Sequence, residues 1–212
     1  MSAPVNEDVL WDNTVSVENT VPLNNTVSVD EVVLLDEQGT PIGTAAKSEV
    51  HGTDTPLHLA FSCYVSNESG DILVTRRSLH KTAWPGVWSN SFCGHPRPGE
   101  PLTAAVHRRA AEELGLVLSS VEMALPDFRY RATDASGIVE NEVCPVFLAH
   151  TAAQPAPNPE EVMDHAWVHP LRLGQAVQLA PWAFSPWLVL QAPLLPLLAG
   201  VSVPDVCADV AQ

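Results

Sequence analysis

The stretch that decides the fold runs from Gly94 to Leu116 and reads GHPRPGEPLTAAVHRRAAEELGL. Its second half predicts a helix over 101–114, because the segment is rich in alanine and has Pro101 at its first position. Gly115 follows directly, where a helix commonly takes a left-handed C-terminal cap. A carboxylate on such a rigid helix can hold a hard cation such as Mg²⁺, with phosphate oxygens completing the coordination shell.

The spacing of glycine, glutamate and arginine in this stretch resembles the Nudix box, a loop–helix–loop that holds a divalent metal against a diphosphate. The resemblance implies an α/β (α+β) fold, a Nudix-type α/β/α sandwich with a mixed sheet, and makes Glu113 the ligand of a Mg²⁺ that binds with the substrate diphosphate. Arg109 stands where the hydrolase pattern has its first catalytic glutamate, which argues against diphosphate hydrolysis. Without the resemblance, an ordinary surface helix in which Glu112 and Glu113 pair with Arg108 and Arg109 is the alternative.

The segment leading into this stretch, WPGVWSNSFCGHP from Trp84 to Pro96, contains a cysteine in an unusual setting. A lone cysteine is most often a small buried apolar residue. Here, however, the surrounding Trp, Gly and His residues make the segment similar to type I isopentenyl diphosphate isomerase, and the similarity extends over about residues 31 to 195. The resemblance implies that Cys93 is catalytic, counts Cys93 among the metal-binding residues as well, and makes His95 a metal ligand.

Two carboxylates share one face of a predicted strand further along the chain. Side chains two residues apart on a strand lie about 7 Å from each other, so Glu140 and Glu142 repel and resist burial unless one is protonated or a cation lies between them. At an exposed sheet edge both would simply be solvated. The resemblance makes both residues metal ligands, gives Glu142 a second role in proton transfer, and assigns Tyr130 to assist Glu142 by hydrogen bonding.

Two histidines upstream complete a possible metal site. Isolated histidines are more often structural than ligating, but His51 and His58 match the family's two upstream metal ligands. Together with His95, Glu140 and Glu142 they make a set of five ligands. Mixed imidazole and carboxylate ligation suits one Zn²⁺ or Mn²⁺, and the sequence does not choose between them.

The remaining candidate residues concern the substrate. Lys47, Arg77 and Lys81 match family positions that hold the diphosphate, although a solvated hairpin end would explain the last two equally well. Trp187 matches the family's aromatic lid over the reacting carbons, whereas an aromatic residue in an apolar helix is more often part of a core.

The reaction implied by the resemblance is isomerisation of isopentenyl diphosphate to dimethylallyl diphosphate, through a tertiary carbocation, in isoprenoid precursor biosynthesis. Cys93 and Glu142 would exchange protons with the two ends of the allylic system. No redox cofactor is required. The alternatives are a Nudix nucleotide diphosphate hydrolase and a metal-binding module without catalysis.

The charge distribution favours a small anionic ligand and argues against a nucleic-acid surface. The chain has a formal net charge of −15, whereas nucleic-acid surfaces need clustered Lys and Arg. Nine of its ten cations lie between Lys47 and Arg131, where nine carboxylates balance them. This neutral segment can accept a phosphorylated substrate that the acidic remainder of the chain repels.

Composition predicts one core and no membrane association. The longest apolar run, 188–201, is interrupted by Gln191, Pro193 and Pro196 and falls short of the roughly 20 residues that span a bilayer. The acidic N-terminus lacks the basic start of a secretory signal, so we expect a cytoplasmic protein. Its four cysteines show no CxxC spacing, which favours free thiols. The sequence is silent on oligomeric state, with a monomer slightly favoured.

The chain divides into a core domain with two tails. Residues 1–30, in which Asn-Thr-Val recurs three times at a six-residue spacing, are expected to form a disordered extension, with an added edge strand as the alternative. The domain is expected over 31–200 and a C-terminal tail over 201–212. Turn signals and apolar runs predict strands at 31–35, 57–65, 72–75, 128–133, 137–148 and 166–168, and helices at 170–178 and 185–198.

Overall fold

The computed structural model describes residues 30–199, so the predicted N-terminal extension before Asp30 and the tail over 201–212 lie outside the described residues. The first half contains β1 (Glu31–Leu35), β2 (Pro41–Ala46), α1 (Lys47–Val50), β3 (His58–Leu59), β4 (Phe61–Ser66), β5 (Ile72–Arg77), β6 (Trp88–Ser89), β7 (Phe92–Gly94) and α2 (Leu102–Leu114). The second half contains β8 (Ser120–Leu125), β9 (Arg129–Thr133), β10 (Val139–Val143), β11 (Val146–His150), β12 (Val162–Val168), α3 (Pro170–Leu179) and α4 (Pro186–Gln191), with 3₁₀ turns at Pro181–Ala183 and Ala192–Leu194.

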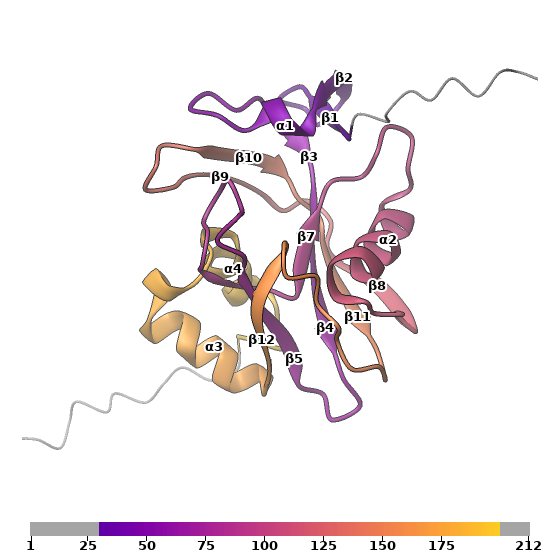
Figure 1. Ribbon diagram of the computed structural model, residues 1–212, viewed down its shortest axis with the longest axis vertical. Helices are drawn as coiled ribbons and strands as arrows, with labels where there is room; N and C mark the ends of the chain where they lie inside the picture. The colour runs from indigo at the N-terminus through magenta and orange to yellow at the C-terminus, as the bar shows by residue number, and fades with distance from the viewer. Residues whose placement is uncertain (1–29, 200–212) are drawn as a thin grey trace, which may run out of the picture.

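The strands form two mixed sheets that share two continuous chain segments. One sheet has the order β2-β1-β3-β10-β9, and the other has the order β12-β5-β4-β11-β8, with β6 beside β5 and β7 beside β4. The parallel pair β3 and β10 in the first sheet continues as the parallel pair β4 and β11 in the second. The two sheets therefore meet where these two segments pass from one to the other (Figure 1).

The passage between sheets corrects two of the expected strands. The single strands predicted over 57–65 and 137–148 are each divided, the first at Ala60 and the second at Cys144 and Pro145. Proline has no N–H to donate to a ladder, so pairing breaks at Pro145. The neighbouring segment bends at the same level, where the amide of Ala60 donates to Val143 O and that of Ser62 donates to Pro145 O.

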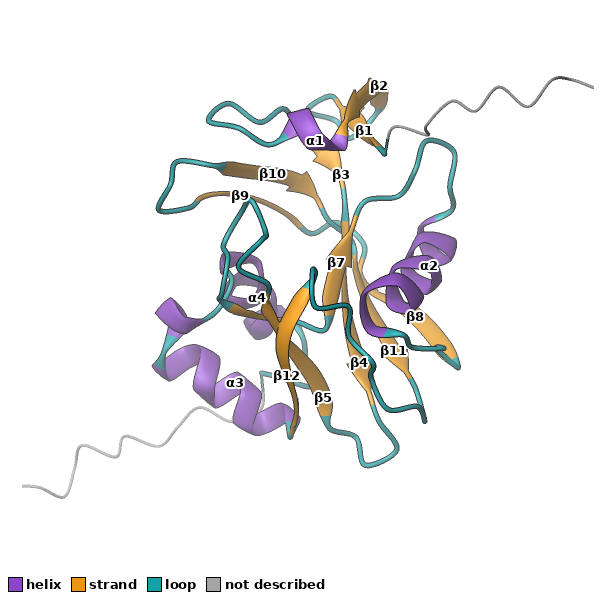
Figure 2. Ribbon diagram, in the orientation of Figure 1, coloured by secondary structure: helices purple, strands orange, loops and turns teal. Residues whose placement is uncertain are grey.

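Helices cover both faces of the second sheet, which confirms the expected α/β sandwich (Figure 2). On one face α2 buries Ala105, Val106, Ala110 and Leu114 in a core that includes Phe61 of β4. A fully buried side chain of the size of Val106 or Leu114 contributes about 1.5–3 kcal/mol to folding. On the other face α3 and α4 pack against β4, β5 and β11 in a second core.

Two glycines fix where α2 lies. A Cβ at Gly94 would lie 2.8 Å from Cγ of Arg109 and 3.0 Å from the ring of Phe61, so only glycine lets α2 approach β7 this closely. Gly115 ends the helix in the left-handed conformation, with φ of 63°, as its position in the sequence predicts. Pro101 is the N-cap residue, so the helix begins one position after the expected start. Within residues 30–199 no helix combines the length and the apolar character that a membrane crossing requires.

Candidate active site

Four of the five predicted ligands converge between the two sheets. The ligating atoms of His51, His58, His95 and Glu142 all lie within 4.8 Å of one another. They come from different elements: the C-cap of α1, β3, the residue after β7, and β10. His58 and Glu142 pair in register on parallel strands, which brings the carboxylate of Glu142 to the imidazole of His58. Nε2 of His95 lies 3.2 Å from Nε2 of His58 and 3.3 Å from Oε1 of Glu142.

The protonation pattern of this group suits a bound cation. Nδ1 of His58 lies 2.9 Å from the carbonyl of Pro56, which can only accept, so the ring hydrogen is on Nδ1 and the lone pair of Nε2 faces the cluster. Burial lowers the pKa of His95 to about 4, more than the neighbouring Glu142 raises it. Metal ligation requires neutral imidazoles, and His95 is already in that form. The contact with Glu142 raises the pKa of His58 against the effect of burial, and a bound cation would favour the neutral form of this ring.

Two buried polar atoms without a hydrogen-bond partner also indicate a cation site. Nε2 of His51 and Oε2 of Glu140 are buried without a hydrogen-bond partner, although they lie 3.0 Å apart. Their separation allows attraction, but their orientation does not make a hydrogen bond. Buried polar atoms are nearly always paired in native proteins, so these two orphaned atoms fit the ligands of a positive ion. Glu140 thus contacts the four-residue cluster through His51 without belonging to it.

The two carboxylates have opposite electrostatic surroundings. Glu140 and Glu142 are 7% and 5% exposed and line the same cavity, as the strand alternation predicts. Burial, followed by the charge of Glu142, raises the pKa of Glu140. Burial would also raise the pKa of Glu142, but hydrogen bonds from His58 and His95 outweigh it and hold that pKa well below its usual range. The pair is therefore divided into one readily protonated and one ionised carboxyl group.

Cys93 lies on β7, and its thiol has two hydrogen-bonding neighbours. Sγ lies 3.3 Å from Oγ of Ser62 and 3.3 Å from Oδ1 of Asn90. Burial raises the pKa of Cys93 to about 12, so the sulfur retains its proton near neutral pH. Tyr130 pairs in register with Glu142 from the adjacent β9, and both residues line the cavity that Cys93 faces.

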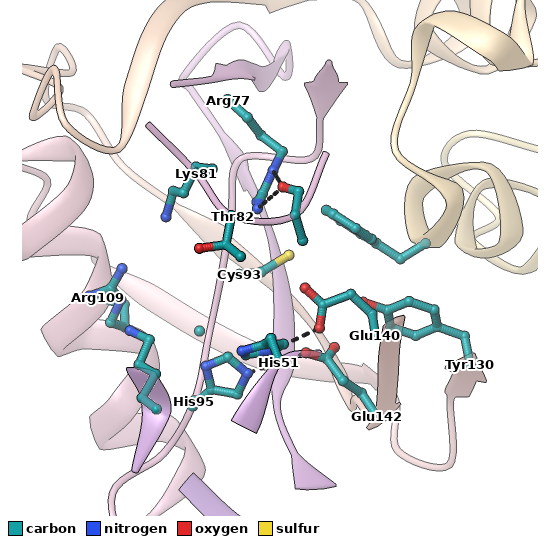
Figure 3. A pocket seen from close by; sticks show the side chains of 14 residues that line it. His51, Arg77, Lys81, Thr82, Cys93, His95, Arg109, Tyr130, Glu140 and Glu142 are labelled. Atoms are coloured by element: carbon teal, nitrogen blue, oxygen red, sulfur yellow. Dashed lines mark hydrogen bonds and ion pairs between the residues drawn. The ribbon is translucent and has the colours of Figure 1, made fainter. Parts of the chain in front are cut away.

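This cavity has a volume of about 170 Å³ and separates cations from carboxylates. Figure 3 shows Lys81 and Arg109 on one side, Glu140 and Glu142 on the other, and the sulfur of Cys93 between them. The lining residues are Lys47, His51, Arg77, Lys81, Thr82, Ala83, Cys93, Gly94, His95, Arg109, Tyr130, Glu140, Glu142 and Trp187.

Three of the four cations that line the cavity pair with carboxylates. Lys47 pairs with Asp30 at 3.3 Å, and Lys81 and Arg109 both contact Glu161. Lys47 and Lys81 were expected in the site from the sequence, whereas Arg109 was noted only as a departure from the hydrolase pattern. Its position in the box was the available signal, but the direction of its side chain depends on how α2 packs against β7.

Arg77 and Trp187 support each other at the edge of the cavity. Nε and Nη2 of Arg77 donate to the carbonyls of Ala83 and Trp84, and its guanidinium carbon lies 5.2 Å from the ring centroid of Trp187. The Trp187 ring is 2% exposed and packs against Tyr130 and Trp84, with centroids 5.9 and 5.6 Å away. Trp187 therefore belongs both to a small core and to the cavity wall.

Glu113 does not join the cluster of histidines. It is buried and makes an ion pair with Arg109 four residues earlier, which is the pairing that the surface-helix alternative describes. A smaller cavity of about 20 Å³, beside the main one, is lined by Glu113, Glu161, Asn90 and Cys93 among others. The roles of Glu113 and of Cys93 as metal ligands stay predictions.

Known proteins resemble this chain in both sequence and fold. The NUDIX domain family matches residues 56–188. A protein of Agromyces mediolanus called isopentenyl-diphosphate Delta-isomerase is 68% identical over 164 residues, which cover 77% of this chain and 80% of that protein. Its namesake in Clavibacter sepedonicus is 64% identical over 159 residues, covering 75% and 84%. A solved protein of Deinococcus radiodurans, 19% identical, matches with a TM-score of 0.55 over 70% of this chain and 89% of its own, which supports the fold alone.

Proposed function

This chain belongs to the isopentenyl-diphosphate Delta-isomerases of the NUDIX domain family, and we propose that Cys93 and Glu142 perform its reaction by moving protons on opposite faces of the substrate. The enzyme converts isopentenyl diphosphate into dimethylallyl diphosphate in isoprenoid precursor biosynthesis. The observation that carries the proposal is a single cavity in which the thiol and the carboxylate both face a space bounded by cations.

The chemistry requires one proton to arrive and another to leave. The π electrons between C3 and C4 take up a proton at C4, which leaves a tertiary cation at C3. Loss of a proton from C2 then returns an electron pair to form the bond between C2 and C3. One of the two residues delivers the first proton and the other accepts the second, while Tyr130 supports Glu142 from the next strand.

Burial of the site protects the cationic intermediate. Cys93 is half-buried and Tyr130 and Trp187 are nearly inaccessible, so water has little access to the reacting carbons. The face of the Trp187 ring attracts positive charge, an effect of about 2 kcal/mol when water is excluded. Lys47, Arg77, Lys81 and Arg109 hold the diphosphate at the other side of the cavity.

Two metal ions complete the proposal. His51, His58, His95 and Glu142, with Glu140 beside His51, would hold one Mn²⁺ or Zn²⁺, and Glu113 would hold a Mg²⁺ with the substrate diphosphate. When bound, these ions supply positive charge that keeps Glu142 ionised and offsets the charge of the diphosphate. We also propose that the enzyme acts in the cytoplasm, since so highly charged a substrate does not cross membranes unaided.

The direct test is incubation of the purified protein with isopentenyl diphosphate and Mg²⁺, followed by NMR of the products. Dimethylallyl diphosphate should accumulate while the diphosphate stays intact. Release of inorganic phosphate without any allylic product would favour the nucleotide-hydrolase alternative. Arg109, in place of the first catalytic glutamate of the hydrolase pattern, argues against that alternative.

A further inference from the structure

Asn90 is a fully buried residue between β6 and β7 whose amide has only one possible orientation. Its Nδ2 lies 3.0 Å from the carbonyl oxygen of Cys63 and 2.8 Å from that of Phe92. Backbone carbonyls only accept hydrogen bonds, so the nitrogen must face them. Oδ1 of Asn90 is thereby turned toward the side of the protein where the reacting groups lie.

Three donors share that oxygen. Nε1 of Trp187 lies 2.9 Å from it, Oγ of Ser89 also 2.9 Å, and Sγ of Cys93 3.3 Å. A carbonyl oxygen has two lone pairs, so the weakest of the three donors, the thiol, is held least firmly. The contact places the sulfur of Cys93 beside the amide oxygen that also accepts from the Trp187 indole.

The two groups joined in this way come from distant parts of the chain. Cys93 lies on β7 of the second sheet, whereas Trp187 lies in α4, a helix of six residues. A contact of 3.0 Å between Oγ of Ser89 and Oγ of Ser185 holds the start of that helix against the same turn. The Asn90 side chain is thus a direct link between the thiol and the indole ring.

We propose that Asn90 is a positioning residue that sets the Cys93 thiol and the Trp187 ring at a fixed spacing around the substrate carbons. The inference rests on the proposed function, because it assumes that the thiol and the ring act on the same substrate. Misplacement of reacting groups by about 1 Å can cost on the order of 100-fold in rate. Asn90 affects the rate through the positions of Cys93 and Trp187.

The test combines Asn90→Ala and Trp187→Phe in a double-mutant cycle. Trp187→Phe keeps an aromatic face but removes the N–H that binds Asn90. Asn90→Ala should lower kcat by about 10- to 100-fold while KM for isopentenyl diphosphate changes by less than about threefold. In the Trp187→Phe background, the further loss caused by Asn90→Ala should be clearly smaller, because one of its two targets is already released.

Asn67→Ala is the matched control. Asn67 also holds a turn by side-chain hydrogen bonds, to the amides of Ser69 and Asp71, but it lies in the connection between β4 and β5 and does not line the cavity. The Asn67→Ala protein should be less stable than the wild type but should have the same kcat. Metal content, measured by elemental analysis, should be the same in all five proteins, because Asn90 does not contact the histidine cluster.

Two results would overturn the inference: a folded Asn90→Ala protein with kcat within about threefold of wild type, or strictly additive losses in the cycle. If Asn90→Ala does not fold, Trp187→Phe can still overturn the inference, since the inference requires its kcat to fall by at least about tenfold. An inactive wild type would instead contradict the proposed function, so the two failures are distinguishable.

Discussion

At the scale of single residues, the sequence identified reactive side chains but could not assign their neighbours. Glu140 and Glu142 were placed on one face by strand alternation alone, and both line the cavity. Opposite shifts of their pKa values could not be foreseen. His58 and His95, which are distant in sequence, lower the pKa of Glu142, whereas burial and the charge of Glu142 raise the pKa of Glu140. Asn90 gave no signal, since its role depends on contacts with β4, β7 and α4.

Replacing His51 by alanine should empty the metal site. Its Nε2 is an orphaned buried atom beside Glu140, so the loss removes one ligand and leaves an uncompensated carboxylate. Elemental analysis after dialysis should find the Mn²⁺ or Zn²⁺ lost. His107→Ala, an exposed change on α2, should retain it. Full metal content in the His51 variant would show that His51 is not a ligand.

The two proton-handling residues should be separable by substitution. Cys93→Ser replaces the thiol by a hydroxyl, a much weaker acid, so substrate should still bind while turnover falls by orders of magnitude. Glu142→Gln should lose metal as well as turnover, because it removes a ligand charge. Steady-state kinetics with metal analysis measure both effects. If both variants kept more than about a tenth of wild-type turnover, the two-residue mechanism would be wrong, since one acid–base group is worth roughly 100-fold.

At the scale of elements, the sequence predicted the bounds of helices and strands where a local residue signal marks them. It failed where pairing between distant segments decides how a strand is divided. The C-terminus of α2 follows from Gly115, and β1 has the predicted bounds. The strands expected over 57–65 and 137–148 were wrong as single elements, because an apolar run does not reveal a change of sheet. β2 and β8 were missed because they are largely exposed edge strands with little alternation.

The loop before α2 is attached to the helix by an ion pair that should depend on pH. Nε and Nη2 of Arg108 each donate to a carboxylate oxygen of Glu100 at 2.7 Å. This contact is the main reason that the pKa of Glu100 is lowered. A carboxyl group whose pKa is lowered in the folded protein stabilises the fold at pH values above its ordinary pKa. This stabilisation is lost as the pH falls through the folded-state pKa.

Glu100→Gln should therefore reduce the free energy of unfolding by about 1 kcal/mol near pH 7. The difference from wild type should persist down to about pH 4.5, the ordinary value, and shrink below it. Urea denaturation at several pH values measures it, with Glu122→Gln on the exposed β8 as control. A difference that grew on acidification would have the wrong sign for this ion pair.

At the scale of the whole molecule, the junction of two sheets creates the site. The same breaks that divide the expected strands bring β3 and β10 of one sheet against β4 and β7 of the other. His58, Glu140 and Glu142 then come from the first sheet, whereas Cys93 lies in the second and His95 directly follows β7. Four of the nine cations between Lys47 and Arg131 line the cavity.

Deletion of residues 1–29 should leave turnover nearly unchanged. These residues contribute no basic group and none of the side chains assigned to the site. Comparison of kcat and KM for the full chain and the shortened chain measures the effect. A fall in turnover beyond about tenfold, which is about 1.4 kcal/mol of barrier, would mean that the extension shapes the site.

The central claim, proton exchange at carbon by a thiol and a carboxylate in one cavity, is tested most directly by running the reaction in D₂O. NMR of the wild-type reaction should find deuterium on carbons of the isoprenoid skeleton, in dimethylallyl diphosphate and in recovered isopentenyl diphosphate. The label should be nearly absent over the same time with Cys93→Ser and Glu142→Gln. Unlabelled carbons in the wild-type reaction, together with release of phosphate, would contradict the account.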